Sequence, residues 1–280
     1  MLGRVPDPAL VARLRAAGCV YAEDEAALLE ETAGSPAELT AMVDRRVGGE
    51  PLEHVLGWAE FCGLRVQVDP GVFRPRPRTE FLVEHAADLV RSARAGGPAG
   101  AGADAHRRRT VVVDLCCGSG ALGVALATML GGAELHAADV DPVAVACARR
   151  NVEPLGGQVH EGDLFEALPG GLRGGVDVLL ANVPYVPTAD LDLMPAEARL
   201  HEPVATLDGG PDGLAVLRRV SAEASRWLAP GGHLLTEASA RQAEAAAGLL
   251  RSAGLPATVV TSEEDDATVV VGSAVARCLS

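Results

Sequence analysis

The sequence predicts an α/β fold built on a mostly parallel, doubly wound sheet. Beyond residue 110, short apolar runs typical of buried strands alternate with segments of helical periodicity, and parallel strands need such crossover helices. The chain has 280 residues, of which 48% are apolar, enough for one sizeable core plus a small appendage. The expected strands are 110–115, 134–139, 159–163, 176–181, 233–237, 257–262 and 268–274, and the expected helices are 120–130, 141–151, 213–228 and 239–253.

The first 80 residues predict a small helical unit and a connector. Ser35-Pro36-Ala37-Glu38 is a capping box with proline at the first helical position, and Gly48-Gly49 ends that helix. Short alternating apolar positions over 60–72 favour a hairpin. We expect a helical domain at 1–57, a connector or hairpin at 58–79 and the α/β domain at 80–280, in which 95–109 forms a flexible loop.

Composition excludes several classes of protein. The chain has 24 basic residues, all arginine, against 38 acidic ones, a net charge of −14, whereas nucleic-acid binders concentrate cations. It has no apolar run of the roughly 18 residues that a membrane span needs, and no signal-peptide core. Its 6 cysteines contain no Cys-x-x-Cys pair, and its histidines show no metal-ligand spacing. We therefore expect a cytoplasmic, monomeric protein that holds no metal and binds neither membrane nor nucleic acid.

A glycine-rich loop follows the first strand of the α/β domain. The strand runs into Asp114-Leu115-Cys116-Cys117-Gly118-Ser119-Gly120, and a helix begins at once, so backbone N–H groups are free to meet a ligand. Gly118, Gly120 and Gly123 match G-x-G-x-x-G, and Asp139 lies 19 residues after Gly120. This pattern is typical of dinucleotide sites, so an NAD oxidoreductase is one hypothesis.

Polar residues at four successive strand ends favour a different cofactor. Asp114, Asp139, Asp163 and Asn182 are separated by 25, 24 and 19 residues, and the carboxyl ends of parallel strands form one crevice. Asp114 would repel a pyrophosphate but suits a cation. S-adenosylmethionine fits this set: its ammonium and sulfonium near Asp114, its ribose hydroxyls on Asp139 and its adenine amino group near Asp163.

The turn Asn182-Val183-Pro184-Tyr185 closes the fourth strand and resembles the Asn-Pro-Pro-Tyr motif of methyltransferases that act on planar NH2 groups. An amide nitrogen is a poor nucleophile because its lone pair is delocalised. The side-chain oxygen of Asn182 and the carbonyl of Val183 can each accept one N–H, which orients the lone pair and stabilises the developing positive charge. Pro184 stiffens the turn, and Tyr185 can stack on the planar group.

Taken together, these motifs resemble the HemK/PrmC-type protein-(glutamine-N5) methyltransferases over nearly the whole chain. Further likenesses are Gly57–Phe61, Phe73–Glu80, Glu202-Pro203 and Gly209–Leu214. The resemblance implies a class I S-adenosylmethionine-dependent methyltransferase domain, Rossmann-like with an antiparallel C-terminal hairpin, plus a small N-terminal helical domain. It also implies, as substrate, the glutamine of a Gly-Gly-Gln loop in peptide-chain release factors.

The resemblance assigns site residues. Catalysis and substrate binding fall to Asn182, Val183, Pro184 and Tyr185, and Arg76 is a further substrate-binding candidate, whereas Arg74 and Arg78 are expected to form a solvated charge run. Glu202-Pro203 is expected to shape the loop after the active site. The cofactor-binding set is Asp114, Cys116, Cys117, Gly118, Ser119, Gly120, Asp139, Asp163, Leu164 and Asn182.

Three residues depart from the family pattern. Val183 replaces a proline, Cys116 replaces a glycine and so requires a negative φ or local adjustment, and Leu164 replaces an aromatic that covers adenine. These departures keep alternatives open: glutamine methylation of a ribosomal protein, or a cofactor-binding paralogue without turnover. The shared Asn-x-Pro-Tyr turn also leaves N6-adenine methylation of nucleic acid as an alternative, against which the net charge counts.

Overall fold

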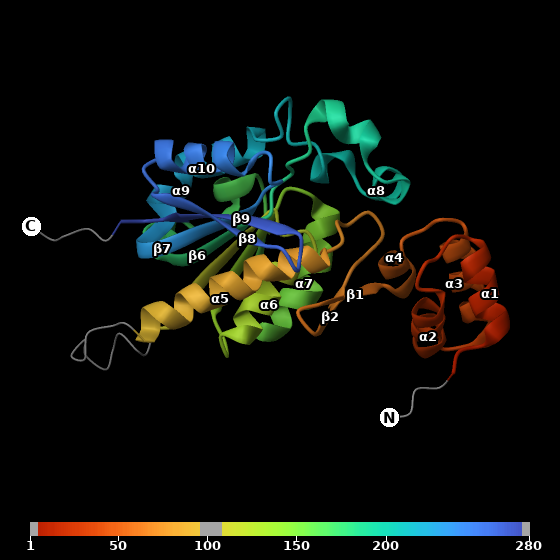
Figure 1. The fold of residues 1–280 in the computed structure, drawn as a ribbon. Coiled ribbons are helices and arrows are strands. Elements are labelled where there is room, and N and C mark those ends of the chain that lie inside the picture. The colour runs from red at the N-terminus through yellow and green to blue at the C-terminus, as the bar shows by residue number, and fades with distance from the viewer. Residues whose placement is uncertain (1–4, 96–107, 276–280) are drawn as a thin grey trace, which may run out of the picture.

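The computed structural model describes residues 5–95 and 108–275, and its centre is a seven-stranded sheet (Figure 1). The strand order is β5-β4-β3-β6-β7-β9-β8, with β9 antiparallel to both β7 and β8 and the other pairs parallel. The α/β prediction, its mostly parallel sheet and its antiparallel C-terminal hairpin are confirmed. The strands are β3 (Val111–Leu115), β4 (Glu134–Asp139), β5 (Gln158–Glu161), β6 (Val176–Ala181), β7 (Leu228–Glu237), β8 (Ala257–Ser262) and β9 (Ala267–Ser273).

Helices cover both faces of this sheet because its central strands are apolar on both sides. Val112 of β3 packs into the core beneath α5, α6 and α7, whereas Val111 and Val113 pack into the core beneath α9 and α10. Each face therefore buries its own apolar layer. These helices are α5 (Glu80–Ala95), α6 (Ala121–Met129), α7 (Pro142–Val152), α9 (Ala215–Trp227) and α10 (Ala243–Ser252).

The N-terminal helices form a separate small core. Leu14, Leu29 and Val43 are buried together there, and Ser35 caps its helix by accepting from the Glu38 amide at 3.2 Å. The elements are α1 (Pro8–Ala16), α2 (Ala22–Thr32), α3 (Pro36–Val47) and α4 (Leu52–Leu56), followed by the hairpin β1 (Trp58–Phe61) and β2 (Leu64–Gln67). Figure 1 shows this hairpin between the helical unit and the sheet.

The hairpin is fastened to α7 beside the glycine-rich loop. The Asn151 side chain accepts from the Gln67 amide at 2.9 Å and donates to the carbonyls of Gln67 and Ser119, both at 2.9 Å. One asparagine thus joins the connector to the loop after β3.

Short helical turns complete the connections. Besides α8 (Ala196–His201), these are the 3-10 segments η1 (Pro77–Thr79), η2 (Glu153–Leu155), η3 (Leu164–Ala167), η4 (Gly170–Leu172), η5 (Thr188–Leu193) and η6 (Val204–Thr206). The segment η5–α8–η6 follows the Asn182–Tyr185 turn and leads back toward α9. No helix within 5–95 and 108–275 has the length and apolar character to cross a bilayer.

Two elements start several residues from their predicted positions. Strand β7 begins at Leu228 rather than at 233, because Gly231 and Gly232 hydrogen-bond to Ala274, although Gly231 has a φ of 79° and the pairing with β6 shifts register there. Helix α10 begins at Ala243 rather than at 239, with Gln242 at its N-cap position and no side-chain cap. The loop expected at 95–109 falls almost wholly outside the described residues.

Candidate active site

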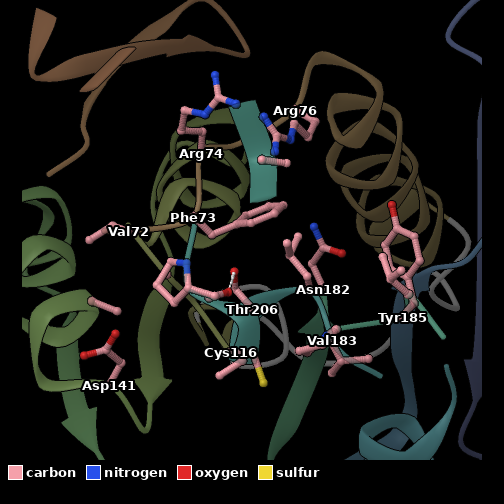
Figure 2. A pocket seen from close by; sticks show the side chains of 18 of the residues that line it. Val72, Phe73, Arg74, Arg76, Cys116, Asp141, Asn182, Val183, Tyr185 and Thr206 are labelled. Atoms are coloured by element: carbon pink, nitrogen blue, oxygen red, sulfur yellow. Dashed lines mark hydrogen bonds between the residues drawn. The ribbon is translucent and has the colours of Figure 1, made fainter. Parts of the chain in front are cut away.

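The site lies where the order of strands reverses in the sheet. Strands β4 and β5 lie to one side of β3, and β6 and β7 to the other, so the loops that follow β3 and β6 diverge and leave a crevice. A cavity of about 460 Å³ occupies it, within the range of small-molecule sites (Figure 2). Its lining includes Phe73, Arg74, Arg76, Arg78, Cys116, Gly118, Asp139, Val140, Asp141, Asn182, Val183, Pro184, Tyr185, Glu197 and Thr206.

The loop after β3 turns through left-handed backbone conformations. Cys116, Gly118 and Gly120 have φ values of 54°, 54° and 77°. A Cβ on Gly120 would lie 2.8 Å from Val152 Cγ2, so glycine permits the close approach of α7. Cys116 adopts a positive φ rather than the negative one that a non-glycine residue prefers, so its backbone is strained.

Asp139 ends β4 at the rim of the cavity. Its carboxylate accepts from the Gly118 amide at 2.8 Å and from the Asp141 amide at 3.0 Å. Burial raises the pKa of this group, and the two backbone N–H groups oppose the shift. A carboxylate has about four acceptor positions, so two remain for hydroxyl donors in the cavity.

Asp114 lies beneath the glycine-rich loop rather than in the cavity lining. It is 1% exposed, and it accepts from the Gly123 amide in the first turn of α6 at 2.9 Å. Burial raises its pKa to about 7. A Cβ on Gly123 would lie 2.8 Å from Leu135 Cδ1 and 3.1 Å from Asp114 Oδ2, so the third glycine of G-x-G-x-x-G serves packing.

Asp163 and Leu164 also lie outside the lining. Asp163 pairs with Arg219 at 2.6 Å, and Leu164, with φ of 49°, packs toward the α9 and α10 core. Of the predicted cofactor residues, the cavity brings together Cys116, Gly118, Asp139 and Asn182. Cofactor contacts from Asp114, Cys117, Ser119, Gly120, Asp163 and Leu164 remain predictions.

The turn after β6 faces the cavity with its polar groups available. Asn182, Val183, Pro184 and Tyr185 all line it, and Figure 2 shows the Asn182 amide beside the Phe73 ring in this view. Among the described residues, the Asn182 side chain and the Val183 carbonyl have no hydrogen-bond partner at all. Both oxygens are therefore free to accept N–H groups of a ligand.

The Tyr185 side chain is held by hydrogen bonds to the buried Glu237 and the partly exposed Arg78. Its hydroxyl donates to Glu237 Oε1 at 3.0 Å and accepts from Arg78 Nη2 at 2.6 Å. Glu237 also accepts from Arg78 Nε at 2.8 Å and from Thr79 Oγ1 at 2.6 Å. Burial and the neighbouring Glu237 raise the pKa of Tyr185 to about 12, so the hydroxyl keeps its proton.

The far end of the turn is fixed by α10. Gln242 Nε2 donates to the carbonyl of Tyr185 at 2.9 Å and to that of Asp212 at 3.0 Å. Neither Gln242 nor Glu237 was among the predicted site residues. Glu237 ends β7, so extending the series of polar strand ends by one strand identifies it, whereas no local signal marks Gln242.

The arginines of the connector are paired, which corrects the expected solvated charge run. Arg74, 5% exposed, donates to Glu53 at 2.7 Å, Glu202 at 3.1 Å and Glu197 at 3.5 Å. Arg76 donates to both oxygens of Glu202, at 2.6 and 2.7 Å. The carboxylate of Glu202 is wholly buried and fastens the segment after α8 to the connector.

The lining suits S-adenosylmethionine chemically. Asp139 offers acceptors for ribose hydroxyls, Val140 offers an apolar surface, and the positive φ of Gly118 lets backbone approach closely. Within the described ranges, no three His, Cys, Asp or Glu side chains are grouped to hold a metal ion.

Comparisons with known proteins point to one family. The model of the methyltransferase small domain matches residues 103–211. The release factor glutamine methyltransferase of Geobacter sulfurreducens is 39% identical over 85% of this chain and 79% of its own length. That of Deinococcus radiodurans is 36% identical over 91% of this chain and 87% of its own. The 4-amino-L-phenylalanine/4-methylamino-L-phenylalanine methyltransferase of Streptomyces pristinaespiralis is 36% identical over 76% of this chain and 69% of its own.

Solved structures show the same fold at low sequence identity. The hMettl16 catalytic domain, in complex with an RNA hairpin, has a TM-score of 0.55 at 15% identity and covers 89% of this chain and 82% of its own. The Thermus thermophilus 16S rRNA N2 G1207 methyltransferase, in complex with AdoMet and guanosine, has a TM-score of 0.50 at 23% identity and covers 78% of this chain and 49% of its own. The dinucleotide interpretation of G-x-G-x-x-G is set aside because the relatives of 36–39% identity are methyltransferases. With the class I S-adenosylmethionine-dependent methyltransferase fold and relatives that match most of its length, the chain belongs to the release factor glutamine methyltransferase family.

Proposed function

We propose that this protein transfers a methyl group from S-adenosylmethionine to the N5 amide nitrogen of the glutamine in the Gly-Gly-Gln loop of a peptide-chain release factor. The single observation that carries this proposal is the pair of free acceptors at Asn182 and Val183, in the same cavity that Gly118 and Asp139 line. Membership of the family supports the choice of substrate.

The acceptor turn compensates for the low nucleophilicity of an amide. Asn182 Oδ1 and the Val183 carbonyl each accept one N–H of the substrate, which fixes the plane of the NH2 group and aims the nitrogen lone pair. Bound S-adenosylmethionine supplies the electrophilic methyl carbon on its sulfonium. As the N–C bond forms and the S–C bond breaks, positive charge develops on nitrogen, and the two oxygens stabilise it.

No general base is required in this scheme. The N-methylated amide cation is a strong acid and loses one proton to water after transfer. Because Val183 contributes a backbone carbonyl, its side chain does not alter the acceptor, and its replacement of proline removes only rigidity. The contacts of Tyr185 with Glu237 and Gln242 supply rigidity to the same turn.

Other groups in the cavity bind rather than react. Asp139 is the residue to hold ribose hydroxyls, and the 116–120 loop the segment to receive the remainder of the cofactor. Tyr185 and Phe73 offer aromatic surfaces to the planar amide. Arg76 is a further substrate contact. These cofactor contacts are proposed from the chemistry of the residues named.

A second candidate is N-methylation of an arylamine. The relative from Streptomyces pristinaespiralis acts on 4-amino-L-phenylalanine, and an arylamine presents the same flat NH2 group to a pair of acceptors. The aromatic side chains of Phe73 and Tyr185 in the lining favour this candidate. Glutamine in a ribosomal protein and adenine N6 present the same group, although the net charge of −14 opposes nucleic-acid binding.

Mass spectrometry tests the proposal directly. The purified protein is incubated with S-adenosylmethionine carrying a deuterated methyl group and with a release factor, a ribosomal protein fraction, 4-amino-L-phenylalanine or an adenine-containing oligonucleotide. We expect one labelled methyl on the loop glutamine and none on a release factor whose glutamine is replaced by alanine. Labelling of another acceptor in place of the release factor, or of none, overturns the proposal.

A further inference from the structure

Two arginines line the cavity, and they differ in how many of their nitrogens have a partner. Arg74 has an acidic partner at each of its three nitrogens: Glu202 at Nε, Glu53 at Nη1 and Glu197 at Nη2. Arg76 uses only Nη2, which donates to both oxygens of Glu202. Among the described residues, Nε and Nη1 of Arg76 have no partner. Arg76 therefore keeps two nitrogens for a ligand, whereas every nitrogen of Arg74 already has an acidic partner.

Glu202 determines where those donors lie. Its side chain is wholly buried, and its carboxylate takes three hydrogen bonds from the two arginines. The Arg76 guanidinium also lies over the Phe73 ring, 5.0 Å from the centroid. The Phe73 ring lies against one face of the guanidinium, and the Glu202 carboxylate holds its Nη2 edge. Figure 2 shows Arg76 at the end of the cavity away from Cys116.

The chemistry of the reacting amide limits which carbonyl of the peptide the unused Arg76 donors can bind. A guanidinium that donated to the oxygen of the reacting amide would draw the nitrogen lone pair into the carbonyl and slow attack. A main-chain carbonyl next to the glutamine has no such effect, and a peptide loop supplies several. The Arg76 side chain is 23% exposed, and a charge-assisted hydrogen bond from its unused donors to such a carbonyl stabilises the complex.

We propose, on the basis of the proposed function, that Glu202 is a positioning residue that holds Arg76 to receive a main-chain carbonyl of the peptide acceptor. Glu202 touches neither cofactor nor substrate in this arrangement. Its loss weakens binding of the peptide and leaves the chemical step and the binding of the cofactor unchanged.

The test measures peptide affinity and turnover separately. A Gly-Gly-Gln loop peptide is titrated in the presence of S-adenosylhomocysteine into the wild type, Glu202→Gln, Arg76→Lys and the double variant. We expect Glu202→Gln and Arg76→Lys each to raise the peptide Kd and KM about tenfold, with kcat within twofold and the S-adenosylhomocysteine Kd unchanged. The double variant should be no worse than either single variant, because both remove one interaction.

Glu53→Gln is the matched control. It removes another carboxylate from Arg74 and does not touch Arg76, so the peptide Kd should stay within twofold while the melting temperature falls. Glu202→Asp, one methylene shorter, should be intermediate. If Glu202→Gln does not fold, Arg76→Lys and Glu202→Asp carry the same test.

The outcomes separate this inference from the proposed function. A folded Glu202→Gln or Glu202→Asp protein with unchanged peptide Kd, or a loss confined to kcat, overturns the positioning role alone. A wild-type protein that neither binds nor methylates the peptide or a whole release factor overturns the proposed function itself.

Discussion

The buried carboxyl of Asp114 predicts a specific pH dependence of folding stability. Burial raises its pKa to about 7 in the folded protein, whereas the pKa of an aspartate in an unfolded chain is about 3.9. The folded state therefore holds this proton more tightly. The stabilising contribution is complete below about pH 4 and is lost as the pH rises to about 7.

The structure sets an upper limit on the effect. At about 1.4 kcal/mol per pH unit, the interval between the two pKa values corresponds to about 4 kcal/mol in the free energy of unfolding. Asp114→Asn keeps an oxygen that can accept from the Gly123 amide and removes the titration. We expect the variant to match the wild type near pH 4 and to exceed it by a few kcal/mol at pH 8.

Urea unfolding of the ligand-free protein between pH 4.5 and 8 measures this difference. Asp88→Asn is the control, because that side chain is 71% exposed and its pair with Arg91 lies on the surface. Its stability curve should run parallel to that of the wild type. If the Asp114→Asn curve also runs parallel, or if that variant is the less stable protein at pH 8, the account of a protonated buried carboxyl is refuted.

Three further predictions concern Cys116 in the loop after β3 and the two residues that hold Tyr185. Because φ of Cys116 is 54°, Cys116→Gly should raise the free energy of unfolding by about 0.5–1 kcal/mol, and Cys116→Val should lower it by more than about 1 kcal/mol. Denaturant melts in which both variants shift in the same direction would contradict this. Glu237→Gln removes the charged partner of Arg78 and should lower kcat about tenfold with the cofactor-product Kd unchanged, as steady-state rates and calorimetry would show; a changed Kd alone would count against it. Gln242→Ala frees the carbonyl of Tyr185 and should also lower kcat more than affinity, so a rate equal to that of the wild type would exclude its role.

The sheet could be predicted from the sequence because apolar runs mark its strands and capping residues mark the helices between them. Strands β4 and β6 have the expected bounds, and Asp141 caps α7 as an Asp-Pro pair predicts, accepting from the Val143 amide at 2.8 Å. The start of β7 was predicted five residues late, because Pro230, Gly231 and Gly232 are typical of turns. The turn-like conformation is present at Gly231, whose φ is 79°, but pairing with Ala274 makes the stretch part of the strand.

The turn that lines the cavity could be predicted from the sequence, whereas the residues that hold the connector arginines in place could not. The turn at 182–185 follows from the order of residue types, but the partners of the connector arginines lie far away in sequence. Glu202 is 126 residues from Arg76, and Glu237 is 159 residues from Arg78. No periodicity or spacing marks such pairs, because they form only when the sheet has folded.

The strand-end position of Asp114 leaves its role open. A polar residue at a strand end predicts a ligand contact, which for Asp114 stays a prediction, and its carboxyl also accepts from the Gly123 amide at the start of α6. Strand-end position alone cannot separate a side chain that meets the crevice from one that supports the loop above it. The side of the strand on which the residue lies decides the outcome.

The central claim is that Asn182 Oδ1 and the Val183 carbonyl together orient the amide for transfer. The most direct test is the single-turnover rate of methyl transfer to the loop peptide in Asn182→Ala, measured with saturating cofactor beside the S-adenosylhomocysteine Kd. We predict that the rate falls by about 10²–10³-fold while that Kd stays within a few-fold of the wild type. A rate equal to that of the wild type would contradict the claim.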